Sequence, residues 1–340
     1  MDKIKLNTIA NNLVQKPKGI LAADESTGTI KKRFDQIKLE SNFENRRKYR
    51  DLLFSTPNLE KYISGIILYD ETIKQNSNKE LSFVDLLKEK NISVGIKVDQ
   101  GTKTMINSDN EKITEGLDGL SSRILEYKNL GAEFTKWRAV ITIGKNFPTK
   151  KCIRLNSIYL SSYARIVQSF DLVPIVEPEI LMDGEHDIKR CYDVTAETLK
   201  KLFEELNNQD VYLGGILLKP NMVISGTNCS LQSSPEDVAR LTIKCLSENV
   251  PKEVPGVVFL SGGQSNETAT EHLDLMNKIS RLPFQLSFSY GRALQHPAIS
   301  NWLGENSNIK KAQEALYKRS RLNSLASVGE YNSSLEKTPL

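Results

Sequence analysis

One lysine in the sequence follows directly on an apolar run. Residues 216–218 read Ile-Leu-Leu, which is typical of a buried strand, and Lys219 comes next. A lysine is rarely buried unless it has an ionic partner or a chemical task. Burial near other cations disfavours the ammonium form, and the free amine is a nucleophile that forms a Schiff base with a carbonyl group. The alternative is a structural ion pair of Lys219 with Glu177 or Glu179.

Other polar residues hold the same position, at the carboxyl end of a short apolar run. Three charged pairs are spaced i, i+2, which places both side chains of a pair on one face of a strand. The residues at these run ends are Asp24, Lys97 with Asp99, Lys136 with Arg138, Glu177 with Glu179, Lys219, Ser261 and Arg292. Taken singly, each has a structural alternative, such as an edge charge or, for Asp24 or Ser26, a helix N-cap. Together they predict a site, because helix surfaces already supply the charge needed for solubility.

Two glycine-containing turns follow the last two apolar runs. They read SGGQS (261–265) and SYGR (289–292). Glycines let backbone N–H groups approach an anion, and Arg292 adds a forked donor. The position of these turns late in the strand series predicts a phosphate-binding site, since loops after strands 7 and 8 commonly form one in an α/β barrel.

The histidines and cysteines do not suggest a metal or redox site. The three histidines, His186, His272 and His296, form neither HExxH nor HxH, and we expect His272 on a helix surface. The four cysteines, Cys152, Cys191, Cys229 and Cys245, form no CxxC pair. A carboxylate-bound Mg²⁺ is harder to exclude, but the interspersed lysines argue against it. The sequence therefore predicts metal-free chemistry with no cofactor.

The elements that must position these residues alternate along the chain. Short apolar runs occur at 19–24, 62–68, 93–98, 134–141, 172–179, 213–219, 256–263 and 285–291, and several are rich in Ile and Val, as buried parallel strands are. Helical patterns lie between them, at 82–90, 119–131, 233–250 and 266–276. Eight strands alternating with helices favour a (β/α)8 TIM barrel over an open doubly wound sheet. In that fold the carboxyl ends of all eight strands meet at one mouth, where chemistry takes place.

Composition narrows the possible partners. The chain has 340 residues, with 46 basic and 42 acidic side chains and a net charge of +4. That balance argues against a dedicated nucleic-acid-binding protein and is compatible with a small anionic substrate. No apolar run reaches the roughly 18 residues of a membrane span, and the first fifteen residues resemble an amphipathic helix rather than a signal peptide. We expect a cytoplasmic protein with one barrel domain, residues 1–318, and a flexible C-terminal tail, residues 319–340.

Several motifs, in order along nearly the whole chain, resemble those of class I fructose-bisphosphate aldolase. They are LAADESTG (21–28), GIKVDQG (95–101), GLDGLSSR (116–123), AEFTKWRAV (132–140), VPIVEPEI (173–180), LLKPNM (217–222), FLSGGQS (259–265) and SFSYGRALQ (287–295). The resemblance implies a metal-independent lyase on a (β/α)8 barrel, usually a homotetramer. It would reversibly cleave fructose 1,6-bisphosphate to dihydroxyacetone phosphate and glyceraldehyde 3-phosphate in glycolysis and gluconeogenesis.

The resemblance also implies roles for single residues. Lys219 matches the Schiff-base lysine, and Glu177 matches the acid/base of carbinolamine formation and dehydration. Asp24 matches the group that takes the C4 hydroxyl proton, Lys136 a lysine that contacts substrate, and Glu179 a carboxylate that orients this cluster. Lys97 and Arg138 match substrate and phosphate contacts. The binding site for the phosphate of the dihydroxyacetone half is matched by Ser261, Gly262, Gly291 and Arg292, and the contacts to the other end of the sugar are matched by Ser26 and Arg33.

The sequence departs from the family pattern in two places. Gln100 stands where many relatives have Lys, and residues 102–112, expected in a loop, are unlike the family forms. The chain also ends in Leu340, whereas animal members end in a tyrosine that assists proton exchange at C3, and Tyr331 need not replace it. Two other functions stay open: a Schiff-base aldolase preferring another sugar phosphate, such as sedoheptulose 1,7-bisphosphate, and a scaffold that binds the cytoskeleton.

Overall fold

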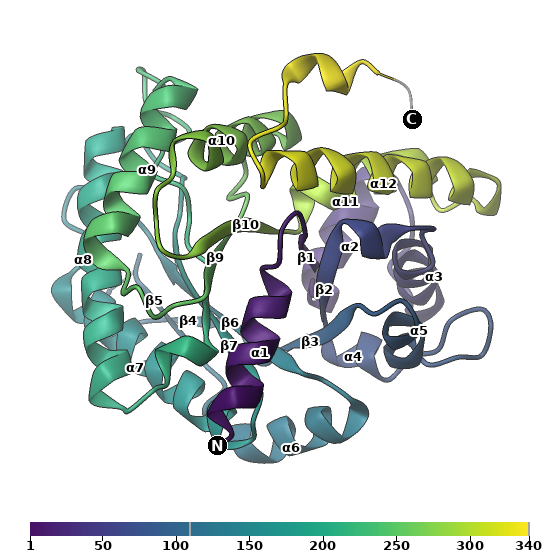
Figure 1. Ribbon diagram of the computed structural model, residues 1–340, viewed down its shortest axis with the longest axis horizontal. Coiled ribbons are helices and arrows are strands. Elements are labelled where there is room, and N and C mark those ends of the chain that lie inside the picture. The colour runs from purple at the N-terminus through teal and green to yellow at the C-terminus, as the bar shows by residue number, and fades with distance from the viewer. Residues whose placement is uncertain (109, 339–340) are drawn as a thin grey trace.

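The protein forms a closed parallel barrel. The computed structural model describes residues 1–108 and 110–338. Eight strands close the barrel in the order β1, β2, β3, β6, β7, β8, β9, β10, and β10 pairs with β1 (Figure 1). Their bounds are β1 Gly19–Ala22, β2 Ile63–Leu68, β3 Ser93–Lys97, β6 Phe134–Ile141, β7 Val173–Ile180, β8 Leu217–Leu218, β9 Gly256–Phe259 and β10 Gln285–Tyr290. Each lies within or overlaps one predicted run, so the predicted (β/α)8 barrel is confirmed.

The helices surround the barrel (Figure 1). Their bounds are α1 Lys3–Leu13, α2 Thr27–Gln36, α3 Phe43–Phe54, α4 Asp70–Ile73, α5 Phe83–Glu89, α6 Leu120–Leu130, α7 Lys150–Ser169, α8 Ile188–Asn208, α9 Pro235–Asn249, α10 Asn266–Ile279, α11 Arg292–Trp302 and α12 Ile309–Ala326. Local sequence sets several ends. Ser234 caps α9 by accepting the N–H of Asp237, with Pro235 as the first helical residue. Gly131 ends α6 in a left-handed conformation, with φ of 107°.

The amino ends of the strands are closed by α1. Leu6, Ala10 and Leu13 of this helix are fully buried in a cluster of apolar side chains that fills the barrel interior. At Gly65 in β2 an added Cβ would lie 2.7 Å from a methyl group of Leu13, so the helix approaches the strands too closely for any larger residue there. This apolar end of the barrel, which we call the plug, leaves the opposite end as the open mouth.

The segment expected as a loop after β3 contains a small hairpin. Strands β4 (Thr102–Thr104) and β5 (Lys112–Thr114) pair antiparallel beside the barrel mouth. Glu111 anchors the hairpin, because its buried carboxylate accepts hydrogen bonds from the N–H and the hydroxyl of Thr149 at 2.6 and 3.0 Å. Part of the segment expected as a loop, at Thr102–Thr104 and from Lys112 onward, thus forms strands.

The C-terminal region begins with a long helix. The predicted boundary between barrel and tail, at residue 318, lies inside α12, where Leu322 and Ala326 are fully buried. Tyr331 is also buried, and Glu336 forms an ion pair with Arg319 at 2.6 Å. The flexibility of the predicted tail stays a prediction. None of the described helices is both long and apolar enough to cross a membrane.

Candidate active site

A polar cavity of about 560 Å³ opens at the carboxyl ends of the strands. All thirteen residues predicted for catalysis or substrate binding line it: Asp24, Ser26, Arg33, Lys97, Lys136, Arg138, Glu177, Glu179, Lys219, Ser261, Gly262, Gly291 and Arg292. They come from seven of the eight barrel strands, all except β2, and from the segments after them. The barrel therefore brings together residues that lie up to 268 positions apart, from Asp24 to Arg292 (292 − 24).

Lys219 lies at the centre of this cavity and is almost completely buried. Its backbone N–H donates to the carbonyl of Val176 in β7 at 2.8 Å, which continues the β8 pairing to the lysine. Its Nζ lies 3.2 Å from Oε1 of Glu177, and the two side chains are 5% and 4% exposed. The ion pair that was the structural alternative is thus present, and it places a carboxylate beside the amine.

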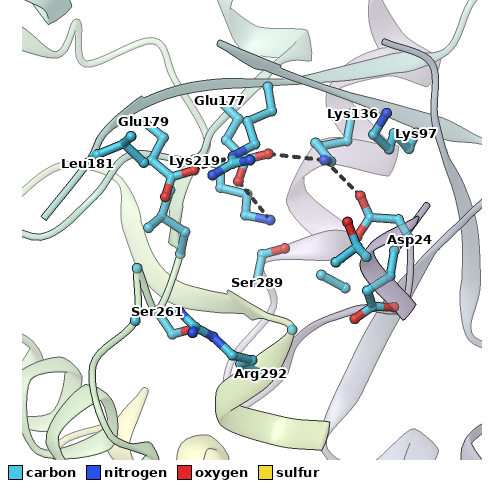
Figure 2. A pocket seen from close by; sticks show the side chains of 18 of the residues that line it. Asp24, Lys97, Lys136, Glu177, Glu179, Leu181, Lys219, Ser261, Ser289 and Arg292 are labelled. Atoms are coloured by element: carbon cyan, nitrogen blue, oxygen red, sulfur yellow. Dashed lines mark hydrogen bonds and ion pairs between the residues drawn. The ribbon is translucent and has the colours of Figure 1, made fainter. Parts of the chain in front are cut away.

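The other oxygen of Glu177 belongs to a second ion pair. Nζ of Lys136 lies 3.3 Å from Oε2 of Glu177 and 2.7 Å from Oδ2 of Asp24. Lys219, Glu177, Lys136 and Asp24 therefore form a continuous chain of alternating charge across the mouth, as the dashed lines in Figure 2 show. Asp24 is consequently engaged with Lys136, and no cap contact to α2 is seen for it.

The electrostatics keep the Asp24–Lys136 pair ionised. Burial alone would raise the pKa of Asp24, but the ammonium groups of Lys136 and Lys219 outweigh it and hold that pKa well below its usual range. Burial alone would lower the pKa of Lys136, but attraction to Asp24 and Glu177 raises it instead. Asp24 is therefore a carboxylate throughout the physiological pH range.

The remaining charged residues of the i, i+2 pairs form two further ion pairs beside this chain. Nε of Arg138 donates to Glu179. Arg138 lies two positions after Lys136, and Glu179 lies two positions after Glu177, so the second members of these two pairs also bind each other. Lys97 contacts Asp99 through Oδ1 at 2.6 Å and through its carbonyl at 2.7 Å. Both members of the pairs Lys136/Arg138 and Glu177/Glu179 thus line the cavity at the mouth, whereas of the third pair only Lys97 does, and Asp99 lines a neighbouring pocket.

The glycine turns after β9 and β10 lie next to each other. Gly262 and Gly263 have φ of 61° and 105°, which non-glycine residues rarely adopt. An added Cβ at Gly263 would lie 2.9 Å from Nη2 of Arg292, so the guanidinium rests against this turn. Figure 2 shows Ser261 and Arg292 together on one side of the cavity, with Lys219 above them. A turn rich in exposed N–H groups beside an arginine is suited to a phosphate.

Ser26 and Arg33 were predicted to contact the other end of the sugar. Ser26 lies immediately before α2, and Arg33 lies within this helix. Ser26 precedes α2, but its hydroxyl contacts Thr29 Oγ1 at 3.2 Å instead of capping the backbone. Arg33 is held by an ion pair to the buried Glu25 at 2.5 Å. Its Nη2 lies 3.6 Å from the position of a Cβ on Gly291, so Arg33 is close to the turn after β10.

The sequence did not single out two further residues of the cavity. Ser289 in β10 lines it, and its buried hydroxyl has no hydrogen-bond partner among the described residues. Glu25 binds both Arg33 and Arg50, the latter at 2.7 Å. The signal for Ser289 was available, because Ser287 and Ser289 alternate with aromatic residues and so share one face of the strand.

One expectation about the histidines is wrong. His272 is 5% exposed rather than on the helix surface, because α10 turns this side chain toward the segment after β9. Within residues 1–108 and 110–338, no cluster of three or more His, Cys, Asp or Glu side chains is arranged to hold a metal ion. The four cysteines are unpaired.

Three comparisons with known proteins agree. The family model described as fructose-bisphosphate aldolase class-I matches residues 5–339. The chain is 52% identical to fructose-bisphosphate aldolase 1 of Toxoplasma gondii, over 95% of this chain and 89% of the relative. It is 49% identical to a probable fructose-bisphosphate aldolase class 1 of Xanthomonas axonopodis pv. citri, over 96% and 98%. Its fold matches a solved fructose-bisphosphate aldolase from Plasmodium falciparum, in complex with TRAP and a small molecule inhibitor, with a TM-score of 0.96, 50% identity and coverage of 97% and 96%.

Proposed function

The chain belongs to the class I fructose-bisphosphate aldolase family, and from that premise we propose that Lys219 is the nucleophile that forms the Schiff base. The protein is a lyase that cleaves fructose 1,6-bisphosphate. The observation that carries the proposal is the chain of charge from Lys219 through Glu177 and Lys136 to Asp24. It places an amine, a proton-transfer group and a second carboxylate within one cavity.

The first half of the reaction joins Lys219 to the sugar. Lys219 first passes a proton to Glu177, its partner in the ion pair. The free amine then attacks the C2 carbonyl carbon, and the carbonyl oxygen takes up a proton, which gives a carbinolamine. Glu177, 3.2 Å from Nζ, is positioned to move protons between nitrogen and oxygen, so that the hydroxyl leaves as water and a protonated iminium remains. Glu179 orients the cluster through its ion pair with Arg138.

The second half breaks the C3–C4 bond. Asp24, ionised as described, accepts the C4 hydroxyl proton, a C4=O bond forms, and the electrons of the C3–C4 bond move into the iminium to give an enamine. Lys136 stabilises the carboxylates on both sides of it, and we assign it a contact with the substrate as well. Protonation of the enamine at C3 and hydrolysis of the Schiff base then release dihydroxyacetone phosphate and restore Lys219.

The two ends of the cavity suit the two phosphates. We assign Ser261, Gly262, Gly291 and Arg292 to the phosphate of the dihydroxyacetone half. Lys97, Arg138, Ser26 and Arg33 are assigned to the rest of the sugar and the second phosphate. Because the iminium itself serves as the electron sink, the proposal needs no metal and no cofactor.

The experiment that tests this function measures triose phosphate formation from fructose 1,6-bisphosphate by the purified protein, with and without EDTA. We expect turnover that EDTA leaves unchanged. Activity that EDTA abolishes and Zn²⁺ or another divalent ion restores would contradict the Schiff-base mechanism. A matched assay with sedoheptulose 1,7-bisphosphate compares the alternative substrate, and a higher kcat/KM for it would reassign the preference.

Assembly and location are proposals as well. The family resemblance supports a homotetramer, which light scattering after size-exclusion chromatography tests directly. The four unpaired thiols support a reducing, cytoplasmic location. The Plasmodium falciparum relative was solved in complex with TRAP, and this favours a protein-binding role beside catalysis as a second candidate. Titration of the protein with purified TRAP tests that role, and absence of binding contradicts it.

A further inference from the structure

The turn after β9 is held by a glutamine. Gln264 donates from Nε2 to the carbonyl of Ser261 at 3.1 Å, and its backbone N–H donates to the same carbonyl at 3.1 Å. Its Nε2 also lies 3.5 Å from Sδ of Met222, three residues after Lys219. The side chain of Gln264 therefore fixes the orientation of the Ser261 carbonyl, which precedes Gly262 and Gly263. It also links this turn to the segment that follows Lys219.

Gln264 is in turn held by His272. Nδ1 of His272, the seventh residue of α10, lies 2.6 Å from Oε1 of Gln264. Rotating the amide by 180° would place Oε1 against the Ser261 carbonyl, where two acceptors repel each other. The amide orientation is therefore fixed by Ser261, and Nδ1 of His272 must carry the proton that Oε1 accepts.

The environment of His272 agrees with this assignment. The side chain is 5% exposed, and burial lowers its pKa to about 4. A neutral imidazole has one N–H, which is the one directed at Gln264. The contact is thus a single hydrogen bond of defined direction at neutral pH.

We propose that His272 is a positioning residue for the phosphate-binding turn, acting through Gln264 to hold the backbone of residues 261–263 in its anion-binding shape. Nδ1–H fixes the amide, the amide fixes the Ser261 carbonyl, and the carbonyl fixes the direction of the N–H groups that follow it. The inference rests on the assignment of this turn to a substrate phosphate. His272 itself does not touch the substrate.

The test compares three variants with the wild type in KM for fructose 1,6-bisphosphate and in inhibition by inorganic phosphate. His272→Leu keeps the size of the side chain and removes the donor. Gln264→Leu removes the intermediate link. His272→Asn restores a donor, because its Nδ2–H takes the place of Nδ1–H. Leu273→Ala, fully buried on the same helix, is the control for general destabilisation of α10.

We expect KM and the phosphate inhibition constant to rise together, about 3- to 10-fold, in His272→Leu and in Gln264→Leu, in keeping with loss of one hydrogen bond. The kcat should change less than about twofold, because phosphate binding is shared by ground and transition states. His272→Asn should return both constants to within about twofold of the wild type. The double variant with His272→Leu and Gln264→Leu should raise KM and the phosphate inhibition constant no further than either single variant does.

Three results would overturn the inference. They are wild-type constants in His272→Leu, wild-type constants in Gln264→Leu, or a rise in His272→Asn as large as in His272→Leu. If His272→Leu does not fold, Gln264→Leu still decides, and a rise in His272→Asn as large as that in Gln264→Leu also contradicts the inference. A failure of the proposed function looks different, since the wild type would then not turn over fructose 1,6-bisphosphate at all.

Discussion

The two ends of this barrel are built from opposite kinds of side chain. At the amino ends of the strands, Leu6, Ala10 and Leu13 of α1 close the interior with apolar contacts. At the carboxyl ends, Lys219 and Lys136 are just as deeply buried, yet both are charged groups paired with carboxylates. The same eight strands therefore carry a hydrophobic closure at one end and an ionic site at the other.

The difference shows which end was shaped by stability alone. Apolar burial stabilises a fold by about 25 cal/mol per Å². Buried ion pairs recover their desolvation cost only when each charge is well partnered, and apolar replacements are often as stable or more so. Charges retained at the mouth therefore indicate chemistry. Changes at the mouth should affect turnover, whereas changes in the plug should affect stability.

The largest expected effect is on turnover, from Lys219→Met at the mouth. Removal of the nucleophile should lower kcat by at least about 10⁴-fold, because no Schiff base forms. Glu177 keeps its pair with Lys136, so thermal unfolding should shift by only a few degrees. Lys201→Met, which removes the ion pairs of Lys201 with Glu204 and Glu205 on α8 outside the cavity, is the matched control and should keep wild-type kcat. Near-normal cleavage by Lys219→Met would assign the nucleophile elsewhere.

The second largest decrease in turnover is expected for Asp24→Asn. The amide cannot accept the C4 hydroxyl proton, so kcat should fall about 10²- to 10⁴-fold, as is usual when a general base is lost. Steady-state cleavage measures it, with Asp237→Asn on the surface of α9 as the control. A decrease below tenfold would show that another group takes that proton.

Leu13→Ala, in the plug, should have the opposite effect: it should lower stability and leave turnover unchanged. Truncation of a fully buried leucine should lower the free energy of unfolding by about 2 to 5 kcal/mol. Urea denaturation measures this, and Ile4→Ala, exposed on the same helix, should cost far less. Both should keep wild-type kcat and KM while folded. A specific loss of kcat in Leu13→Ala would mean that the two ends are not separable.

The smallest expected effect is the dependence of stability on acid. Because the pKa of Asp24 is held below its unfolded value of about 3.9, its contribution to stability is complete above that pH and is lost as pH falls through the lower, folded value. The difference in unfolding free energy between wild type and Asp24→Asn should be constant above about pH 5. Below about pH 4 the wild type should lose stability relative to Asp24→Asn. Denaturation curves at stepped pH measure it, and a difference independent of pH would contradict the pairing.

Much of this comparison could be predicted from sequence. The strands were evident because parallel strands buried on both faces read as apolar runs, and barrel closure then brings their polar ends together. Which charges meet was not predictable. Arg138 lies level with Glu177 in the β6–β7 register, yet it pairs with Glu179, while Lys136 pairs with Glu177. These choices depend on side-chain direction within the closed barrel.

Two expectations failed for related reasons. The β4–β5 hairpin was missed because its strands have three residues each and alternate too briefly to give a pattern. His272 was expected on a surface because its helix is otherwise amphipathic with polar neighbours. Its burial follows from the packing of α10 against the turn after β9, and that contact exists only in three dimensions.

The most direct test of the central claim is chemical trapping at the mouth. The protein is incubated with dihydroxyacetone phosphate, reduced with borohydride, digested and mapped by mass spectrometry, with unreduced protein as the control. We predict one covalent adduct, on the peptide that carries Lys219, together with loss of activity. An unmodified Lys219, or an adduct on another lysine of the cavity such as Lys136, would contradict the mechanism.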